Sequence, residues 1–158
     1  MRLTFLVASL VFAVGCAGNG NSGDDDGSAA PDCSTVTGTD TFTVGLEKMG
    51  AGGFADFKLM SIAPAPVVRG DNTWIVQINS MSSGVVGNPM DGATVTGTPY
   101  MPAHQHGSPI IADVTPTGNP GEYSIAPINM WMPGVWQTTI AVTSGPNPDR
   151  AVFAFCVN

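Results

Sequence analysis

Basic residues are scarce in this sequence. Its 158 residues include five Lys and Arg against twelve Asp and Glu, which gives a formal net charge of -7. Binding to nucleic acid depends on clusters of Lys and Arg that neutralise phosphates. The composition therefore predicts that nucleic acid is not a partner.

The sequence also lacks a helical pattern. No window places apolar residues at i, i+3, i+4 and i+7 between two caps, and 20 Gly and 13 Pro disfavour long helices. Short runs rich in Val, Ile, Thr and aromatic residues recur instead, separated by turn residues. They predict an all-β protein, an antiparallel immunoglobulin-like β-sandwich of about seven to eight strands, with 82–92 among the loops. The runs are 40–49, 54–63, 73–81, 93–101, 109–116, 121–130, 135–142 and 150–157.

Period-2 alternation assigns core faces to two of these runs. It places Trp74, Val76 and Ile78 on one side of their strand, and Trp136, Thr138, Ile140 and Val142 on one side of another. We expect all three tryptophans of the chain to be packed in the core.

A catalytic constellation is missing. Ser108 follows two histidines, but no G-x-S-x-G elbow or glycine-rich oxyanion loop surrounds it. The sequence predicts that the protein is not an enzyme.

The N-terminus has the layout of a secretory signal. Arg2 precedes an apolar run, residues 3–14, that is too short to span a bilayer. The residues that follow Cys16 are small, polar and acidic, which predicts a flexible tether. Ala13, Val14, Gly15 and Cys16 resemble the cleavage site of bacterial lipoproteins. The alternative is an ordinary signal peptide that is cleaved near Ala17.

The lipoprotein resemblance implies that Cys16 is lipidated and that the lipid anchors the protein in a membrane. We then expect a signal peptide at 1–15, a linker at 16–37 and a β-sandwich domain at 38–158. The same resemblance implies that the protein is located in the bacterial cell envelope, on the periplasmic side of the outer membrane or at the cell surface.

Cysteine is rare, and the count of three is odd. If lipid occupies Cys16, then Cys33 and Cys156 remain at the two ends of the domain, in a compartment where disulfides persist. A disulfide between them is predicted. Two buried free thiols are the alternative.

The only two histidines of the chain, His104 and His106, lie in "MPAHQHG". In an extended segment, side chains at i and i+2 project to the same side. Met101 precedes them, and Met130 and Met132 flank Trp131 with both thioethers on the face opposite the indole. Imidazole and thioether ligands together favour copper over zinc. The alternative is a solvated polar loop, with methionines that only fill the core.

The stretch from Gly70 to Val142 contains a pattern that is made up of Asn72, Gly92, Ala93, Met101, Pro102, His106, Gly107, Gly121, Tyr123, Met132, Gly134 and Trp136. This pattern resembles that of the YtkA-like and FixH-like family of small exported β-sandwich domains. The resemblance implies copper delivery or copper resistance in the cell envelope, with envelope metal-transport proteins or other envelope proteins as partners. His104 is additional to the family pattern, and the membrane-spanning helix of FixH-like members is missing, so a role in oxidase assembly is not expected.

The sequence therefore leaves two functions open. The first is a lipoprotein domain that binds copper through Met101, His104, His106 and Met130 or Met132. The second is an envelope interaction or structural module without a metal. Convergence of these side chains would favour the first function, and methionines that point into the core would favour the second.

Overall fold

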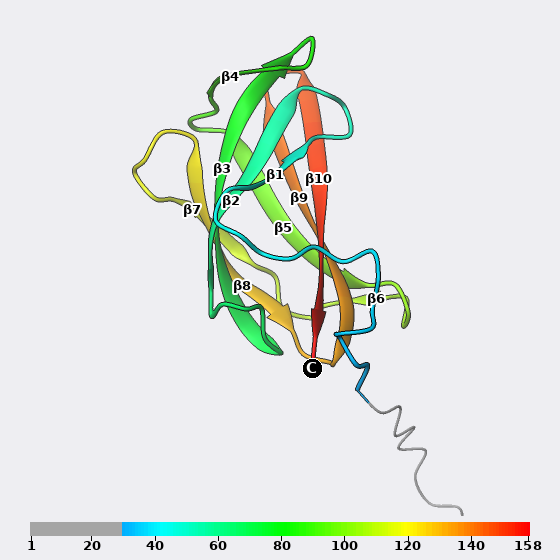
Figure 1. The fold of residues 1–158 in the computed structure, drawn as a ribbon. Coiled ribbons are helices and arrows are strands. Elements are labelled where there is room, and N and C mark those ends of the chain that lie inside the picture. Colours follow the sequence, from blue (N-terminus) through cyan, green and yellow to red (C-terminus); the bar gives the residue numbers. More distant parts are fainter. Residues whose placement is uncertain (1–29) are drawn as a thin grey trace, which may run out of the picture.

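A computed structural model describes residues 30–158, which form two antiparallel β-sheets packed face to face (Figure 1). The larger sheet has the order β1-β2-β3-β8-β7, with β4 also paired to β3, and the smaller has the order β10-β9-β5-β6. The strands are β1 (Leu46–Met49), β2 (Ala55–Ala63), β3 (Gly70–Ser82), β4 (Val85–Pro89), β5 (Thr94–Met101), β6 (His106–Gly107), β7 (Asp113–Pro116), β8 (Glu122–Met130), β9 (Gly134–Ser144) and β10 (Asn147–Val157).

The predicted all-β class and the sandwich are confirmed. Each of the eight predicted runs overlaps one strand, and β3, β9 and β10 extend beyond their runs. Within residues 30–158 there is no helix, and hence none long and apolar enough to cross a bilayer. The predicted signal peptide, Cys16 and most of the predicted tether lie outside the described residues.

Two strands, β4 and β6, were not predicted. Residues 82–92 were expected to be a loop, but Ser83 (φ 52°) and Gly84 (φ 78°) form a two-residue turn that folds β4 back onto β3. Turns with positive φ at both central residues match the twist of a hairpin. Because a serine rarely adopts this conformation, the sequence gives only a weak signal for the turn.

The core lies between the two sheets and contains the faces that alternation predicted. Trp74 and Trp136 are fully buried, and Trp74 makes edge-to-face contacts with Phe153 and Phe155 at centroid distances of 6.4 and 5.4 Å. The expectation that all three tryptophans are in the core is wrong for Trp131, which is 47% exposed. This residue follows the last residue of β8 and lies outside the sheet.

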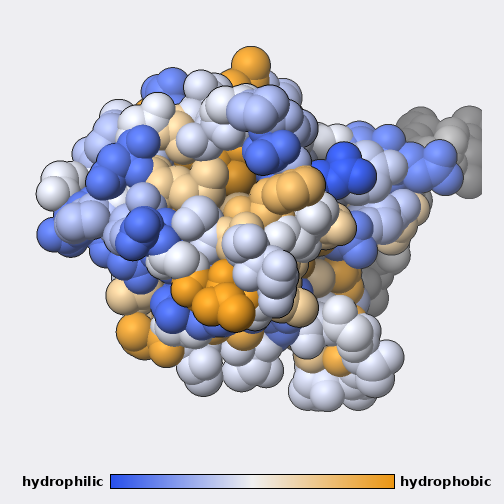
Figure 2. All heavy atoms as spheres, turned by 90° about the horizontal axis from the view of Figure 1, so that it is seen from above, coloured by the Kyte–Doolittle hydropathy of each residue, from blue (hydrophilic) through white to orange (hydrophobic). Residues whose placement is uncertain are grey.

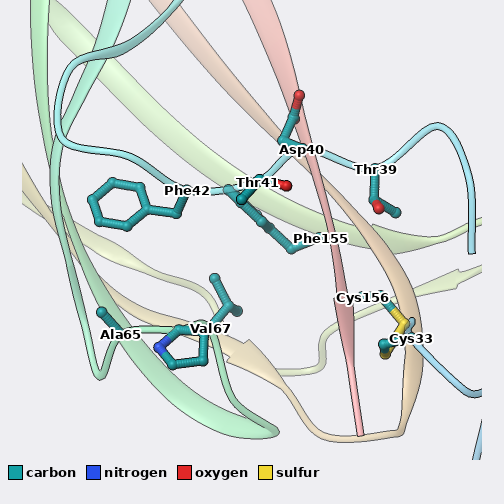
Figure 3. A pocket seen from close by; sticks show the side chains of 10 residues that line it. Cys33, Thr39, Asp40, Thr41, Phe42, Ala65, Val67, Phe155 and Cys156 are labelled. Atoms are coloured by element: carbon teal, nitrogen blue, oxygen red, sulfur yellow. A yellow bond between two sulfur atoms is a disulfide. The ribbon is translucent and has the colours of Figure 1, made fainter.

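The predicted disulfide is present. Cys33 and Cys156 are bonded across a sequence separation of 123 residues, which ties the segment before β1 to the end of β10. The bond lies beside a cleft of about 500 Å³ that Phe42, Val67 and Phe155 help to line (Figure 3).

The end of the sandwich that carries the β3–β4 hairpin presents apolar side chains in small groups between polar ones (Figure 2). The large exposed apolar side chains here are Met49 at the end of β1, Phe54 in the β1–β2 connection, and Val85 and Val86 in β4. The histidine segment lies at the opposite end, where β6 is found (Figure 1).

Candidate functional site

The histidine segment is a hairpin rather than an extended strand. Met101 ends β5, and His106 in β6 pairs back with it. The chain reverses through hydrogen bonds from the His104 amide to the Met101 carbonyl (3.2 Å) and from the Gln105 amide to the Pro102 carbonyl (3.3 Å). Gln105 adopts a left-handed conformation with φ 55°. The prediction that the side chains of His104 and His106 project to the same side assumed an extended segment, so it does not apply to this hairpin.

The two imidazoles nevertheless lie close together. Their ring centroids are 5.8 Å apart, with an angle of 46° between the ring planes. His104 is exposed, whereas His106 is half-buried. We call this surface, formed by residues 101–107 and Trp131, the histidine tip.

His106 is surrounded by two tryptophans. Its ring stacks on Trp131 at 5.2 Å with an interplanar angle of 24°, and it meets Trp136 edge-on at 6.0 Å. Its Nδ1 lies 3.1 Å from the carbonyl oxygen of Gly107. When Nδ1 donates its proton to this carbonyl, Nε2 keeps the lone pair that a metal ion needs.

The predicted thioether ligands lie at different depths. Met101 is 2% exposed and packs in the core, and its side chain leaves the same sheet face as that of its direct partner His106. Met130 is fully buried at the end of β8. Met132 is half-buried against the core, and its carbonyl accepts a hydrogen bond of 2.9 Å from Trp136 Nε1. Strand pairing thus places Met101 opposite His106. The Trp136 indole, which meets the His106 ring, binds the backbone carbonyl of Met132.

Gly134 makes room for Met101. A Cβ atom at this position, where φ is 134°, would overlap with the terminal methyl of Met101. This glycine therefore allows the Met101 thioether to pack against the start of β9.

A polar relay holds the chain that follows the histidines. Asn129, which is 8% exposed, donates from Nδ2 to Asp71 and accepts at Oδ1 from the Ser108 hydroxyl (3.4 Å). The Ser108 hydroxyl also accepts from the Ile110 amide at 3.1 Å. Sequence analysis missed the relay because its partners come from β3, β8 and a loop that are far apart along the chain. Ser108 acts here as a structural hydroxyl.

Residues 30–158 contain no group of three or more His, Cys, Asp and Glu side chains that could hold a metal ion. A metal at the histidine tip would therefore bind the two imidazoles and thioether sulfur. For comparison, an imidazole–zinc bond of about 2 Å places two imidazoles on one ion with centroids roughly 4–6 Å apart. The observed centroid separation of 5.8 Å lies within that range.

A protein-family model described as YtkA-like matches residues 55–141, more than half of the chain. The chain belongs to the YtkA-like family. The predicted membership is confirmed, and the match extends from the start of β2 into β9, including the whole histidine tip. No curated protein and no solved structure matches the chain. Strand β10 and the disulfide lie outside the match, so this YtkA-like domain completes its sandwich with residues beyond the family model.

Proposed function

We propose that this YtkA-like domain binds copper at the histidine tip and serves metal handling or resistance in the bacterial cell envelope. In this proposal His104 and His106 supply nitrogen ligands, and Met101 with Met132 supplies sulfur. The protein acts as a binding module and not as an enzyme.

The separation of the two imidazoles carries the proposal. Two rings with centroids 5.8 Å apart on a tight hairpin are close enough to share one ion. The Gly107 carbonyl beside His106 Nδ1 gives that ring the second hydrogen bond that metal-binding histidines commonly have.

Copper suits the donor set better than other metals. Imidazole binds copper in both common oxidation states, and thioether sulfur favours Cu(I). Met132 is half-buried, whereas Met101 and Met130 are both buried, so Met101 is favoured over Met130 by its pairing with His106 rather than by exposure. The predicted contribution of Met130 would require a movement of the end of β8.

The proposed location depends on Cys16. Lipidation of this cysteine would hold the domain on a membrane, at the periplasmic side of the outer membrane or at the cell surface. The partners of the domain would then be envelope metal-transport proteins, and nucleic acid would not be a partner.

One observation favours the alternative of an envelope interaction module without a metal. Met101 and Met130 point into the core, with 2% and 0% of their surface exposed. Buried methionines are ordinary core filler. The two functions therefore differ in whether the histidines bind copper at all.

The first prediction is that His104→Ala combined with His106→Ala abolishes Cu(II) binding and leaves the melting temperature almost unchanged. The reason is that His104 is exposed and His106 is half-buried at the end of the sandwich. The test is a Cu(II) titration of the full-length chain near pH 7.

All titrations use a Cys16→Ala background, because a free thiol at position 16 would bind copper itself. Met101→Leu serves as a matched variant that keeps the volume of the core and removes the sulfur, and it should weaken Cu(I) binding more than Cu(II) binding. Failure of the parent chain to bind either ion, or equal binding by the double histidine variant, would leave the interaction module as the function.

A further inference from the structure

Trp131 has an unusual position for a tryptophan of this protein. Trp74 and Trp136 are fully buried, whereas Trp131 is 47% exposed just after β8. An exposed indole forgoes much of the free energy that burial of this large side chain would supply. The contact that Trp131 makes instead is with His106.

The stack has the geometry of a specific aromatic contact. The indole and the imidazole are nearly parallel, with an interplanar angle of 24° and a centroid distance of 5.2 Å. Offset aromatic pairs prefer centroid separations of about 4.5–7 Å. Trp136 approaches the same imidazole edge-on at 6.0 Å, and its own indole is fixed by the hydrogen bond to the Met132 carbonyl.

The two histidines are therefore held unequally. Contacts with Trp131 and Trp136 and the Gly107 carbonyl restrict the His106 ring. His104 is exposed, and its aromatic contact is with His106. A ligand that is already oriented loses less conformational freedom on binding than a free one.

We infer that Trp131 is a positioning residue for the metal site: its indole orients the His106 imidazole as the fixed ligand, and exposed His104 closes onto the ion. The inference rests on the proposed copper function. Partners that orient metal ligands without touching the ion typically contribute about 10- to 100-fold to affinity. For a half-exposed stack we expect the lower end of this range.

The experiment compares three variants of the full-length Cys16→Ala chain. Trp131→Ala removes the stack, Trp131→Phe keeps an aromatic face, and Phe54→Ala is the matched control. Phe54 is 46% exposed, almost as exposed as Trp131, and it lies in the β1–β2 connection at the other end of the sandwich. Cu(II) affinity is measured by competition with a chelator, and the melting temperature is measured for each variant.

A second measurement needs no metal. The ring current of a stacked indole shifts the NMR signals of the His106 ring protons in the metal-free chain. Trp131→Ala should remove this shift and leave the signals of His104 much less affected. This NMR measurement reports the stack itself rather than overall stability.

We expect Trp131→Ala to weaken Cu(II) binding roughly ten-fold, Trp131→Phe to restore most of the affinity, and Phe54→Ala to bind like the parent chain. Trp131→Ala with parental affinity, or a parent chain without the ring-current shift, overturns the inference and leaves the copper proposal in place. A parent chain that shows the shift but binds no copper overturns the copper proposal, and the positioning role with it.

Discussion

At the scale of single residues, Asp149 organises one end of the sandwich. Its carboxylate, 6% exposed, accepts hydrogen bonds from the backbone amides of Gly52 (2.7 Å), Phe54 (2.8 Å), Ala55 (2.9 Å) and Arg150 (2.8 Å). These bonds fix the β1–β2 connection on the start of β10. Gly50 is required nearby, because a Cβ atom there would overlap with this carboxylate.

The charge state of Asp149 makes stability depend on pH. Burial alone would raise the pKa of its carboxyl group, but the amide hydrogen bonds from Gly52, Arg150, Phe54 and Ala55 outweigh burial and lower it. A lowered folded-state pKa contributes stability above the unfolded-state value, near 3.9 for aspartate. That contribution is lost as the pH falls through the folded-state pKa.

We predict that Asp149→Asn lowers the free energy of unfolding at pH 7 by about 2 kcal/mol or more. The asparagine side chain has one accepting oxygen where the carboxylate has two, so at least one buried backbone N–H is left without an acceptor. The difference from the parent chain should shrink as the pH falls from about 4 to about 2. Urea denaturation across this pH range provides the measurement.

Asp113→Asn is the control for this experiment, since Asp113 is exposed on β7. It should change stability by less than about 0.5 kcal/mol. A parent–variant difference for Asp149→Asn that stays constant down to pH 2 would contradict the assigned role of its charge.

At the scale of elements, the outer edge of β10 is covered by Lys48 of β1 and by the chain before and after this strand. Asp40 pairs with both backbone groups of Ala154, through its amide (2.6 Å) and its carboxylate (2.7 Å). Lys48 Nζ donates to the Val152 carbonyl (2.8 Å), and the Ala51 amide donates to the Arg150 carbonyl (2.9 Å). Covered edges resist pairing with other chains.

The disulfide strengthens this cover, so its removal should destabilise the protein without unfolding it. Cys33→Ser combined with Cys156→Ser should lower the free energy of unfolding by about 2–5 kcal/mol, because the bond closes a long loop. The hydrogen bonds of Asp40 and Lys48 remain. Chemical denaturation with and without reductant measures the effect.

Reductant should destabilise the parent chain and have no effect on the double serine variant. Cys16→Ser, which keeps the disulfide, should respond to reductant as the parent does. An unchanged denaturation midpoint in the double variant would show that the bond contributes no stability.

At the scale of the whole molecule, the proposed function requires the domain to be held at a membrane. Cys16→Ala should release the protein from the membrane fraction or leave it unprocessed, because the predicted acyl attachment needs the thiol. Fractionation of cells followed by mass determination is the test. A variant that stays membrane-bound at the mature size would exclude lipidation of Cys16.

The sequence by itself determined the fold class and most of the strands. Side chains in a strand alternate with a period of two, so Trp74, Val76 and Ile78 show their buried face without reference to any other part of the chain. Turn residues delimit strands locally in the same way. The sequence also carried the family resemblance and a pair of cysteines suited to a disulfide.

The tertiary structure decided what depends on strand pairing. That Met101 lies opposite His106, that Trp131 stacks on this ring and that Asn129 bridges Asp71 and Ser108 follows from contacts between distant segments. Burial of Met101 depends on the strand that faces it, and exposure of Trp131 depends on where β8 ends. Local patterns carry no information on such neighbours, because the free energy of packing depends on residues that are remote in the sequence.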